Sequence, residues 1–263
     1  MLLNNRDLYG RVLLGALAIA CVEASYVSAL TVTPGRTEIR LSPGESHGAV
    51  LTVANEIKEE LQVEVSKKDW FVLPENKDFK VDRWLQVRGP QKFTLKPGQS
   101  RTIPIKVTCP KGAQGELVGM VSFEYLTDNP GMITPMISVS TYLAIAGTEK
   151  VAGEIVELGV HRWREKLQAA VAIKSTGNVH LRPTGTLTLT DDKGKEVARF
   201  QVPVGEPAYP GQVRGYLGQG PDITLGSGHY TLNADLTYQD LHLTGSRGFS
   251  VASDGQIQMD KVK

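Results

Sequence analysis

The sequence predicts an all-β protein: two tandem β-sandwich domains that follow a cleaved signal peptide. Two patterns predict the strands, because apolar and polar residues alternate and Pro/Gly turns separate the alternating runs. The third observation is a repeat, since the phrase PGQSR at 97–101 returns as PGQVR at 210–214. Strands with one apolar face must pack those faces together, so each half of the chain is expected to form its own core.

The alternation runs through both halves of the chain. In the first half, AVLTVAN, LQVEV, TIPIKV and LVGMVSFEY place apolar residues at every second position. TLTLT and YTLNADLTY do the same in the second half. One segment, EIVELGVHRWREKL at 154–167, could also form an amphipathic helix, but the alternation of Val156, Leu158 and Val160 and the presence of Gly159 favour a strand.

The repeat has an offset of 113 residues, and six identities keep it without a gap. Pro97, Gly98, Gln99, Arg101, Gly115 and Tyr125 match Pro210, Gly211, Gln212, Arg214, Gly228 and Tyr238. Such a period is much longer than a solenoid or propeller unit and is close to one immunoglobulin-type sandwich. The predicted organisation is therefore a signal peptide at 1–29, immunoglobulin-like sandwiches at 30–148 and 149–253, and a flexible tail at 254–263.

The N-terminus reads as an export signal. Arg6 and Arg11 precede the apolar run VLLGALAIACV at 12–22, and Val27-Ser28-Ala29 has the small-x-Ala pattern of a signal peptidase site. The apolar run is shorter than the roughly twenty residues that span a bilayer. Alternatively, Cys21 in LAIAC is the lipidated first residue of a lipoprotein. We expect a periplasmic protein, or in the alternative one that is lipid-anchored or at the cell surface.

Charge and cysteine content limit the kinds of partner. The chain has 29 Lys and Arg against 28 Asp and Glu, a net charge of +1, so it has no strong field to attract nucleic acid or an anionic membrane. After cleavage Cys109 is the sole cysteine, which excludes an intradomain disulfide. We expect recognition of other proteins through shape and backbone, with no nucleic acid and no small-molecule substrate.

The sequence offers no set of residues for catalysis or metal binding. Its five histidines are dispersed, without the short spacing that brings two ligands together. Ser227 and Ser246 lack the Gly-x-Ser-x-Gly elbow of a nucleophile. Asp191 and Asp192 supply far fewer oxygens than the about six to eight that calcium takes. We therefore expect a protein that is not an enzyme and has no catalytic residue, no metal and no cofactor.

Two tryptophans are open to two interpretations. Trp70 and Trp84 flank the polar stretch LPENKDFKVDR at 73–83. They either pack in the core or present anchors for a partner, since tryptophan is enriched in interface hot spots.

Several segments carry a resemblance to a known family. They are LTVTPGRTEIRLSPG, a strand that ends in TVAN, FTLKPGQSRTIPIKV and GELVGMVSFEY. Together they resemble the periplasmic pilus-assembly chaperones of the PapD-like superfamily, which have two immunoglobulin-like domains. The second half, with STGNVHLRPTGTLTL, looks closer to the surface proteins that partner WxL-type cell-wall proteins. The resemblance covers essentially the whole mature chain and indicates the superfamily better than the subfamily.

The resemblance implies a mode of partner binding. In these chaperones the last strand of the first domain adds to a fibre subunit that lacks a strand. The matching segment here is ITPMISVSTYLAIAG at 133–147. Its odd positions form one apolar face, which should fill the home core and leave a weakly apolar face to donate. The expected partner-binding residues are Arg36, Ile133, Met136, Ile137, Ser138, Val139 and Ser140, and Val139→Pro is expected to abolish partner binding as well as destabilise the domain.

The resemblance also implies an anchor for the terminal carboxylate of the subunit. An Arg from the first strand and a Lys from the last strand supply it in the cleft between the domains. Arg36 lies close to the Arg position, and Arg40 is the second choice. The Lys position aligns near Leu143, and 133–147 contains no Lys or Arg, so the second cation is missing.

Two hypotheses of different class follow. The first is an assembly chaperone that pairs an edge strand with secreted subunits of pili or fimbriae. The second is a structural or adhesive surface module that binds another envelope protein. A hydrolytic enzyme has no paired carboxylates or nucleophile–base set to support it.

Overall fold

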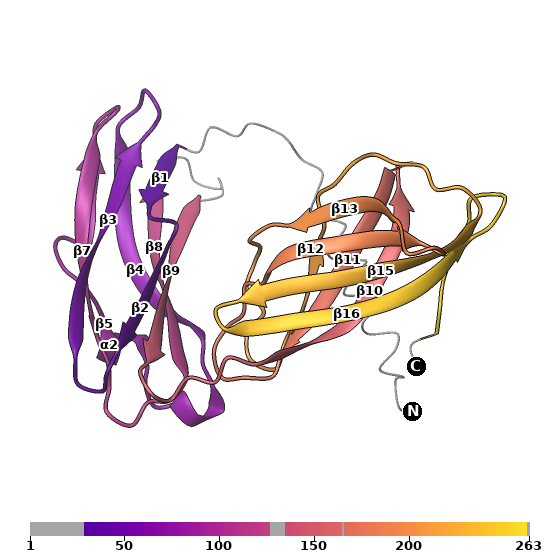
Figure 1. Ribbon diagram of the computed structural model, residues 1–263. Helices are drawn as coiled ribbons and strands as arrows, with labels where there is room; N and C mark the ends of the chain where they lie inside the picture. The colour runs from indigo at the N-terminus through magenta and orange to yellow at the C-terminus, as the bar shows by residue number, and fades with distance from the viewer. Residues whose placement is uncertain (1–28, 127–134, 165, 262–263) are drawn as a thin grey trace, which may run out of the picture. The chain divides into compact units, whose positions relative to one another are not determined.

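The computed structural model describes residues 29–126, 135–164 and 166–261 (Figure 1). The predicted signal peptide apart from Ala29, together with Cys21, lies outside these residues. Contacts divide the chain into two compact units, with the division between Lys150 and Val151. No helix within the described ranges is long and apolar enough to cross a membrane.

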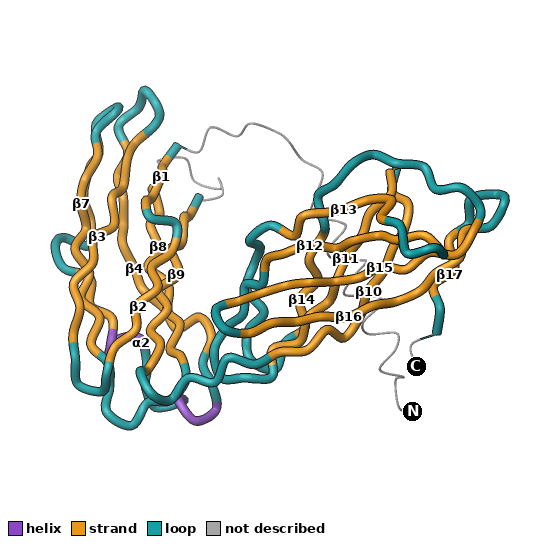
Figure 2. The backbone as a smooth tube through the Cα atoms, in the orientation of Figure 1, coloured by secondary structure: helices purple, strands orange, loops and turns teal. Residues whose placement is uncertain are grey.

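The first domain is an immunoglobulin-like sandwich of two sheets (Figures 1 and 2). One sheet has the order β1-β3-β7-β5, and the other has the order β2-β9-β8-β4-β6. Two short helical turns, Pro74–Asn76 and α2 (Val81–Trp84), follow β4. The strands are β1 (Leu30–Thr33), β2 (Arg36–Leu41), β3 (Ser46–Asn55), β4 (Leu61–Phe71), β5 (Leu85–Val87), β6 (Lys92–Leu95), β7 (Ser100–Thr108), β8 (Glu116–Leu126) and β9 (Met136–Ile145).

The second domain is also an immunoglobulin-like sandwich, so the predicted fold class is confirmed. Its sheets have the orders β10-β11-β14 and β13-β12-β15-β16-β17. The strands are β10 (Gly153–Trp163), β11 (Lys166–Ser175), β12 (Thr184–Asp191), β13 (Glu196–Val202), β14 (Val213–Leu217), β15 (Gly228–Tyr238), β16 (Leu241–Val251) and β17 (Ile257–Met259). The ambiguous segment at 154–167 forms β10 and the start of β11, as its alternation predicts.

Two edge segments of the first domain change from one sheet to the other. The chain pairs with β3 as β1, turns at Pro34-Gly35, and then pairs with β9 as β2. Likewise it pairs with β7 as β5, turns at Gly89-Pro90, and then pairs with β4 as β6. Gly89 has a φ of +113°, a conformation that L side chains rarely adopt. Each segment therefore covers only part of the strand beside it in either sheet.

The alternating side chains of the first domain meet in one core. Leu51 and Val53 of β3, for example, are fully buried. Trp84 is also part of this core, at 1% exposure, whereas Trp70 is 50% exposed and has the Lys68 ammonium 5.8 Å from its ring centroid. The two tryptophans thus take the two alternative roles, core packing for Trp84 and surface exposure for Trp70.

The repeated phrase makes the same turn in both domains. In the first domain the Gly98 backbone N–H donates to the Asn55 carbonyl at 3.1 Å, and the Asn55 backbone N–H donates to the Gln99 carbonyl at 3.0 Å. In the second domain the Gly211 backbone N–H donates to the Ser175 carbonyl at 2.9 Å, and the Ser175 backbone N–H donates to the Gln212 carbonyl at 3.0 Å. Both glycines have positive φ, +68° and +77°. The phrase therefore ties the end of β3 to the segment before β7 in the first domain, and the end of β11 to the segment before β14 in the second.

The C-terminal segment differs from the sequence prediction. The expected flexible tail at 254–263 contains β17, which pairs antiparallel with β16 from Phe249 to Val251. Ile257 and Met259 pack against the core of the second domain. A three-residue strand with two apolar positions is too short for an alternation pattern to show it. The prediction of a flexible tail is therefore wrong for Ile257–Met259.

The parallel pairing of β2 with β9 places two threonines opposite each other whose hydroxyls make no hydrogen bond within the described residues. Thr37 lies opposite Thr141, and both hydroxyls are buried without a hydrogen-bond partner among the described residues. A buried hydroxyl left unsatisfied costs about 1–3 kcal/mol.

We expect Thr141→Val to raise the free energy of unfolding of the first domain by about 1 kcal/mol, because valine has nearly the same shape and no hydroxyl to desolvate. Urea denaturation followed by tryptophan fluorescence measures this. Thr102→Val on the exposed face of β7 is the control and should change stability little. A lower stability of Thr141→Val would contradict the assignment of an unsatisfied hydroxyl.

Candidate functional site: the open half of β9

Strand β9 has a complete neighbour on one side and a partial neighbour on the other. β8 pairs with it antiparallel from Met136 to Ala144. β2 pairs with it parallel, but only from Ser140 to Ile145. The expectation that this last strand of the first domain is an edge strand available to a partner is therefore wrong for Ser140–Ile145. Within the described residues, Met136–Val139 have no strand on the second side, and Ile133 lies outside the described residues.

The hydrogen-bond pattern shows which backbone groups face the open side. Tyr125 donates its N–H to the Pro135 carbonyl at 3.4 Å, and Ile145 donates to Gly115 at 2.9 Å. In an antiparallel ladder directly opposite pairs alternate between bonded and non-bonded, so the odd residues of β9 direct their backbone groups to β8. Met136 and Ser138 consequently direct their N–H and C=O groups to the open side.

The side chains of this half divide between the surface and the core. Met136 is 45% exposed, and Ser138 Oγ lies 2.8 Å from Ser122 Oγ. Ile137 is half-buried against the core, and Val139 is 1% exposed within it. Because Val139 is part of the home core, its side chain is not available to a partner, and its assignment as a partner-binding residue is corrected. Met136 and the backbone of Ser138 are the groups that a partner can reach.

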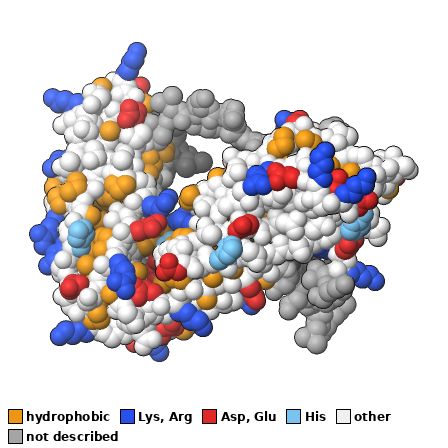
Figure 3. Space-filling model, viewed as in Figure 1, with side chains coloured by type: hydrophobic (Ala, Val, Ile, Leu, Met, Phe, Trp, Pro, Cys, Tyr) orange, Lys and Arg blue, Asp and Glu red, His pale blue; other side chains and the backbone are white. Residues whose placement is uncertain are grey.

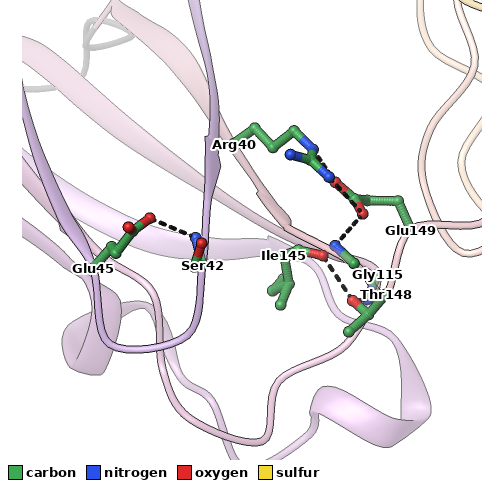
Figure 4. Close-up of polar contacts among 8 residues, drawn as sticks. Arg40, Ser42, Glu45, Gly115, Ile145, Thr148 and Glu149 are labelled. Atoms are coloured by element: carbon green, nitrogen blue, oxygen red, sulfur yellow. Dashed lines mark hydrogen bonds and ion pairs between the residues drawn. The ribbon is translucent and has the colours of Figure 1, made fainter.

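Strand β2 is held at the far end of β9 (Figure 4). The Arg40 guanidinium pairs with the Glu149 carboxylate, which also accepts the Gly147 N–H at 2.8 Å. Thr148 Oγ1 accepts the Gly115 N–H and donates to the Ile145 carbonyl, each at 2.8 Å. These contacts fix the covered end of the β2–β9 ladder.

Arg36 lies at the other end of β2, opposite Ser140, where the covered half of β9 begins. Its guanidinium is exposed and pairs with Glu38 at 2.7 Å. Leu143, the position at which the resemblance implies a lysine, is fully buried in the core. The described part of β9 thus supplies no second cation, and Arg36 is not preorganised with one to hold a carboxylate.

Sequence reasoning missed that β2 covers part of β9. The signal was present, because β2 reads RTEIRL and carries Arg36, Glu38 and Arg40 on its exposed face. Charged side chains at alternate positions are typical of an outermost strand that avoids further pairing. The open half of β9, MISV, has no charged residue.

In the second domain the strand near the corresponding sheet edge, β16, is partly covered by a further strand and is linked to β10. β17 pairs with the end of β16, and Arg247 of β16 donates to the Leu158 carbonyl of β10 at 2.9 Å. Arg247 also lies 3.7 Å from Glu157, where burial raises the carboxyl pKa and the guanidinium opposes that rise. A groove of about 880 Å³ remains between β10 and β16, lined by side chains of both signs. Contacts across this groove link its two strands, so the first domain offers the clearer open edge.

The described residues contain no cluster of three or more His, Cys, Asp or Glu side chains arranged to hold a metal. Cys109 is fully buried, and this burial raises the pKa of its thiol, with a smaller contribution from Glu45. A buried, protonated thiol is a poor nucleophile.

Comparison with known proteins finds similarity at the level of structure. No family model matches the sequence, and no curated protein matches it. The chain is similar to the YadV chaperone, at 10% identity and a TM-score of 0.44, over 83% of this chain and 98% of that one. It is similar to the class 5 fimbriae chaperone CfaA at 16% identity and a TM-score of 0.41, over 89% and 100% of the two chains. The Pseudomonas aeruginosa CupB2 chaperone gives 11% identity and a TM-score of 0.41, over 88% and 97%.

Proline substitutions in β9 should distinguish the backbone N–H groups that face the open side from those that bond to β8. Ser138→Pro removes a donor that faces the open side, and we expect it to cost the first domain about 1 kcal/mol or less beyond Ser138→Ala. Val139→Pro removes a donor that faces β8, and we expect a loss of about 3 kcal/mol or more. Urea denaturation of the three variants measures this, and equal losses for the two prolines would contradict the assigned direction of the backbone groups.

The Arg40–Glu149 contact predicts a pH dependence. Partial burial alone would raise the pKa of Glu149, but backbone N–H groups and Arg40 outweigh it and lower the pKa below its ordinary value. The stabilisation is therefore complete above the unfolded-state pKa of about 4.3 and is lost as the pH falls through the lower folded-state pKa.

We expect Glu149→Gln to lower the free energy of unfolding by about 1 kcal/mol at pH 7, with the difference from wild type shrinking below about pH 4. Urea titrations at pH 7, 5, 4 and 3 measure this. Glu124→Gln, at the other end of the same sheet, is the control. A difference that persists at pH 3 would show that the carboxylate charge is not the cause.

Proposed function

We propose that this chain is an exported, non-enzymatic assembly chaperone that adds the open half of β9 as a strand to secreted subunits of pili or fimbriae. One observation carries the proposal: Met136 and Ser138 direct backbone groups that have no strand partner within the described residues to an uncharged edge that β2 leaves uncovered. The predicted export signal and the resemblance of the sequence motifs support the location and the class of partner.

Backbone pairing suits a chaperone that must accept a subunit and release it. Hydrogen bonds to main-chain groups do not depend on the partner's side chains, so one edge can serve related subunits. Two residues of open edge offer few hydrogen bonds, each worth about 0.5–1.5 kcal/mol net. Such a site binds weakly by itself and is readily exchanged.

The adjoining end of β2 provides a way to lengthen the contact. A partner strand that continued past Ser140 would take the place of Arg36 and Thr37. The cost of that displacement is reduced, because the Thr37 and Thr141 hydroxyls already lack partners within the described residues. The Arg40–Glu149 contact would hold the remainder of β2 in place.

A photo-crosslinking amino acid at Met136 of the full chain, expressed in the native host, tests the proposal. We expect cross-links to an exported polypeptide that assembles into a surface fibre, identified by mass spectrometry. We expect Ser138→Pro to reduce the yield about two- to tenfold, because it removes one open donor, and Ser138→Ala to leave the yield near that of wild type.

A cross-linker at the exposed Lys96 is the positional control and should give no such product. A wall or matrix protein as the partner would favour the structural or adhesive module. An undiminished yield from a folded Ser138→Pro variant would reject strand addition at β9.

A further inference from the structure

A second open edge lies in the other sheet of the first domain. β1 pairs with β3 only from Thr52 to Asn55, whereas β7 pairs with it from Ser46 to Ala54. The Cys109 backbone N–H donates to the Glu45 carbonyl at 2.8 Å. This bond shows which residues of β3 direct their backbone groups toward β7. By the alternation of antiparallel pairs, Ser46, Gly48 and Val50 direct their N–H and C=O groups away from β7. In the described structure no strand accepts them.

This open half lacks the usual defences of an edge. The run SHGAVL at 46–51 contains no Lys, Arg, Asp, Glu or Pro, whereas the outermost strand β2 carries three charges. Val50 is 50% exposed. In Figure 3 hydrophobic side chains reach the surface of the first domain on the face turned to the viewer. The backbone groups of this edge and the Val50 side chain are therefore both accessible to a partner.

The sheet face beside this edge is hollowed and basic. A depression of about 370 Å³ has Gly48 in its lining, and a Cβ added there would meet nothing closer than the Ile105 carbonyl oxygen at 4.0 Å. Lys106 lies opposite Gly48 on β7, and the Arg88 N–H bonds to the Pro104 carbonyl at 2.8 Å. Among the described residues, no carboxylate lines the depression or forms an ion pair with Lys106 or Arg88.

We propose that Ser46–Leu51 is a second strand-addition site, which takes an extended protein segment with an Asp or Glu opposite Gly48. Strands lie about 4.8 Å apart, and directly opposite residues share a face of the sheet. An acidic side chain at that position would extend across Gly48, which has no side chain to block it, toward the Lys106 ammonium. The site is in the opposite sheet from β9 and does not depend on the function proposed for β9.

The alternative is that Lys106 and Arg88 are solvated cations that only keep this sheet face soluble. Backbone amide shifts of the full chain, measured by NMR, separate the two. The probes are two synthetic peptides, Ac-Thr-Val-Thr-Glu-Thr-Val-Thr-NH2 and its counterpart with a central Lys.

We expect the Glu peptide to shift the amides of Ser46, Gly48 and Val50 and to bind about two- to fivefold more tightly than the Lys peptide, the range for a cross-strand charge pair. Lys106→Glu should reverse this preference. Gly48→Val, which fills the depression, should abolish it. Lys96→Glu changes the net charge equally in the turn between β6 and β7 and should leave the preference unchanged.

Three results would overturn the proposal. The first is equal binding of the two peptides, or no shift at millimolar peptide. The second is a response confined to Met136 and Ser138, which would place addition at β9 alone. The third is a concentration-dependent shift of the Ser46, Gly48 and Val50 amides without peptide, which would show that the edge pairs with a second copy of this chain.

Discussion

The division of one segment between two sheets determines the character of the first domain. Because the chain turns at Pro34-Gly35, β1 covers one end of β3 and β2 covers one end of β9. A strand that stayed in one sheet could have covered one of these neighbours along its length and left the other bare. Within the described residues the division instead leaves part of each strand open, and both open parts, Ser46–Leu51 and Met136–Val139, contain no Lys, Arg, Asp or Glu.

The second domain shows that the fold itself does not require this arrangement. Its first strand, β10, remains in one sheet and pairs with β11 along its whole length. The neighbouring edge strand β16 is covered at one end by β17 and is linked to β10 by Arg247. The same repeated turn and the same sandwich therefore occur with two different arrangements at the sheet edge.

Sequence reasoning recovered the features that depend on local chemistry. The Pro-Gly-Gln turns and the buried face of β9 follow from φ preferences and period-two alternation. The neighbours of each strand do not, because alternation fixes which face is buried but says nothing of what lies beside it. Pro34-Gly35 reads as an ordinary turn in the sequence, and the half-covered edge of β9 appears only when β2 is seen to join the other sheet. For the same reason the open half of β3 had no sequence signal except its lack of charge.

The direction of β2 would limit the strand addition that we propose at β9. β2 runs parallel to β9, so a strand that entered at Met136 and advanced would meet the first residue of β2 before the last. That end has an exposed Arg36–Glu38 pair, worth little in water, and two unsatisfied threonine hydroxyls within the described core. The opposite end has the partly buried Glu149 carboxylate, held by Arg40 and a backbone N–H. A partner strand would therefore displace the first residues of β2 easily, and each further residue would cost more free energy. Such a balance would hold a partner firmly enough to protect it and loosely enough to release it.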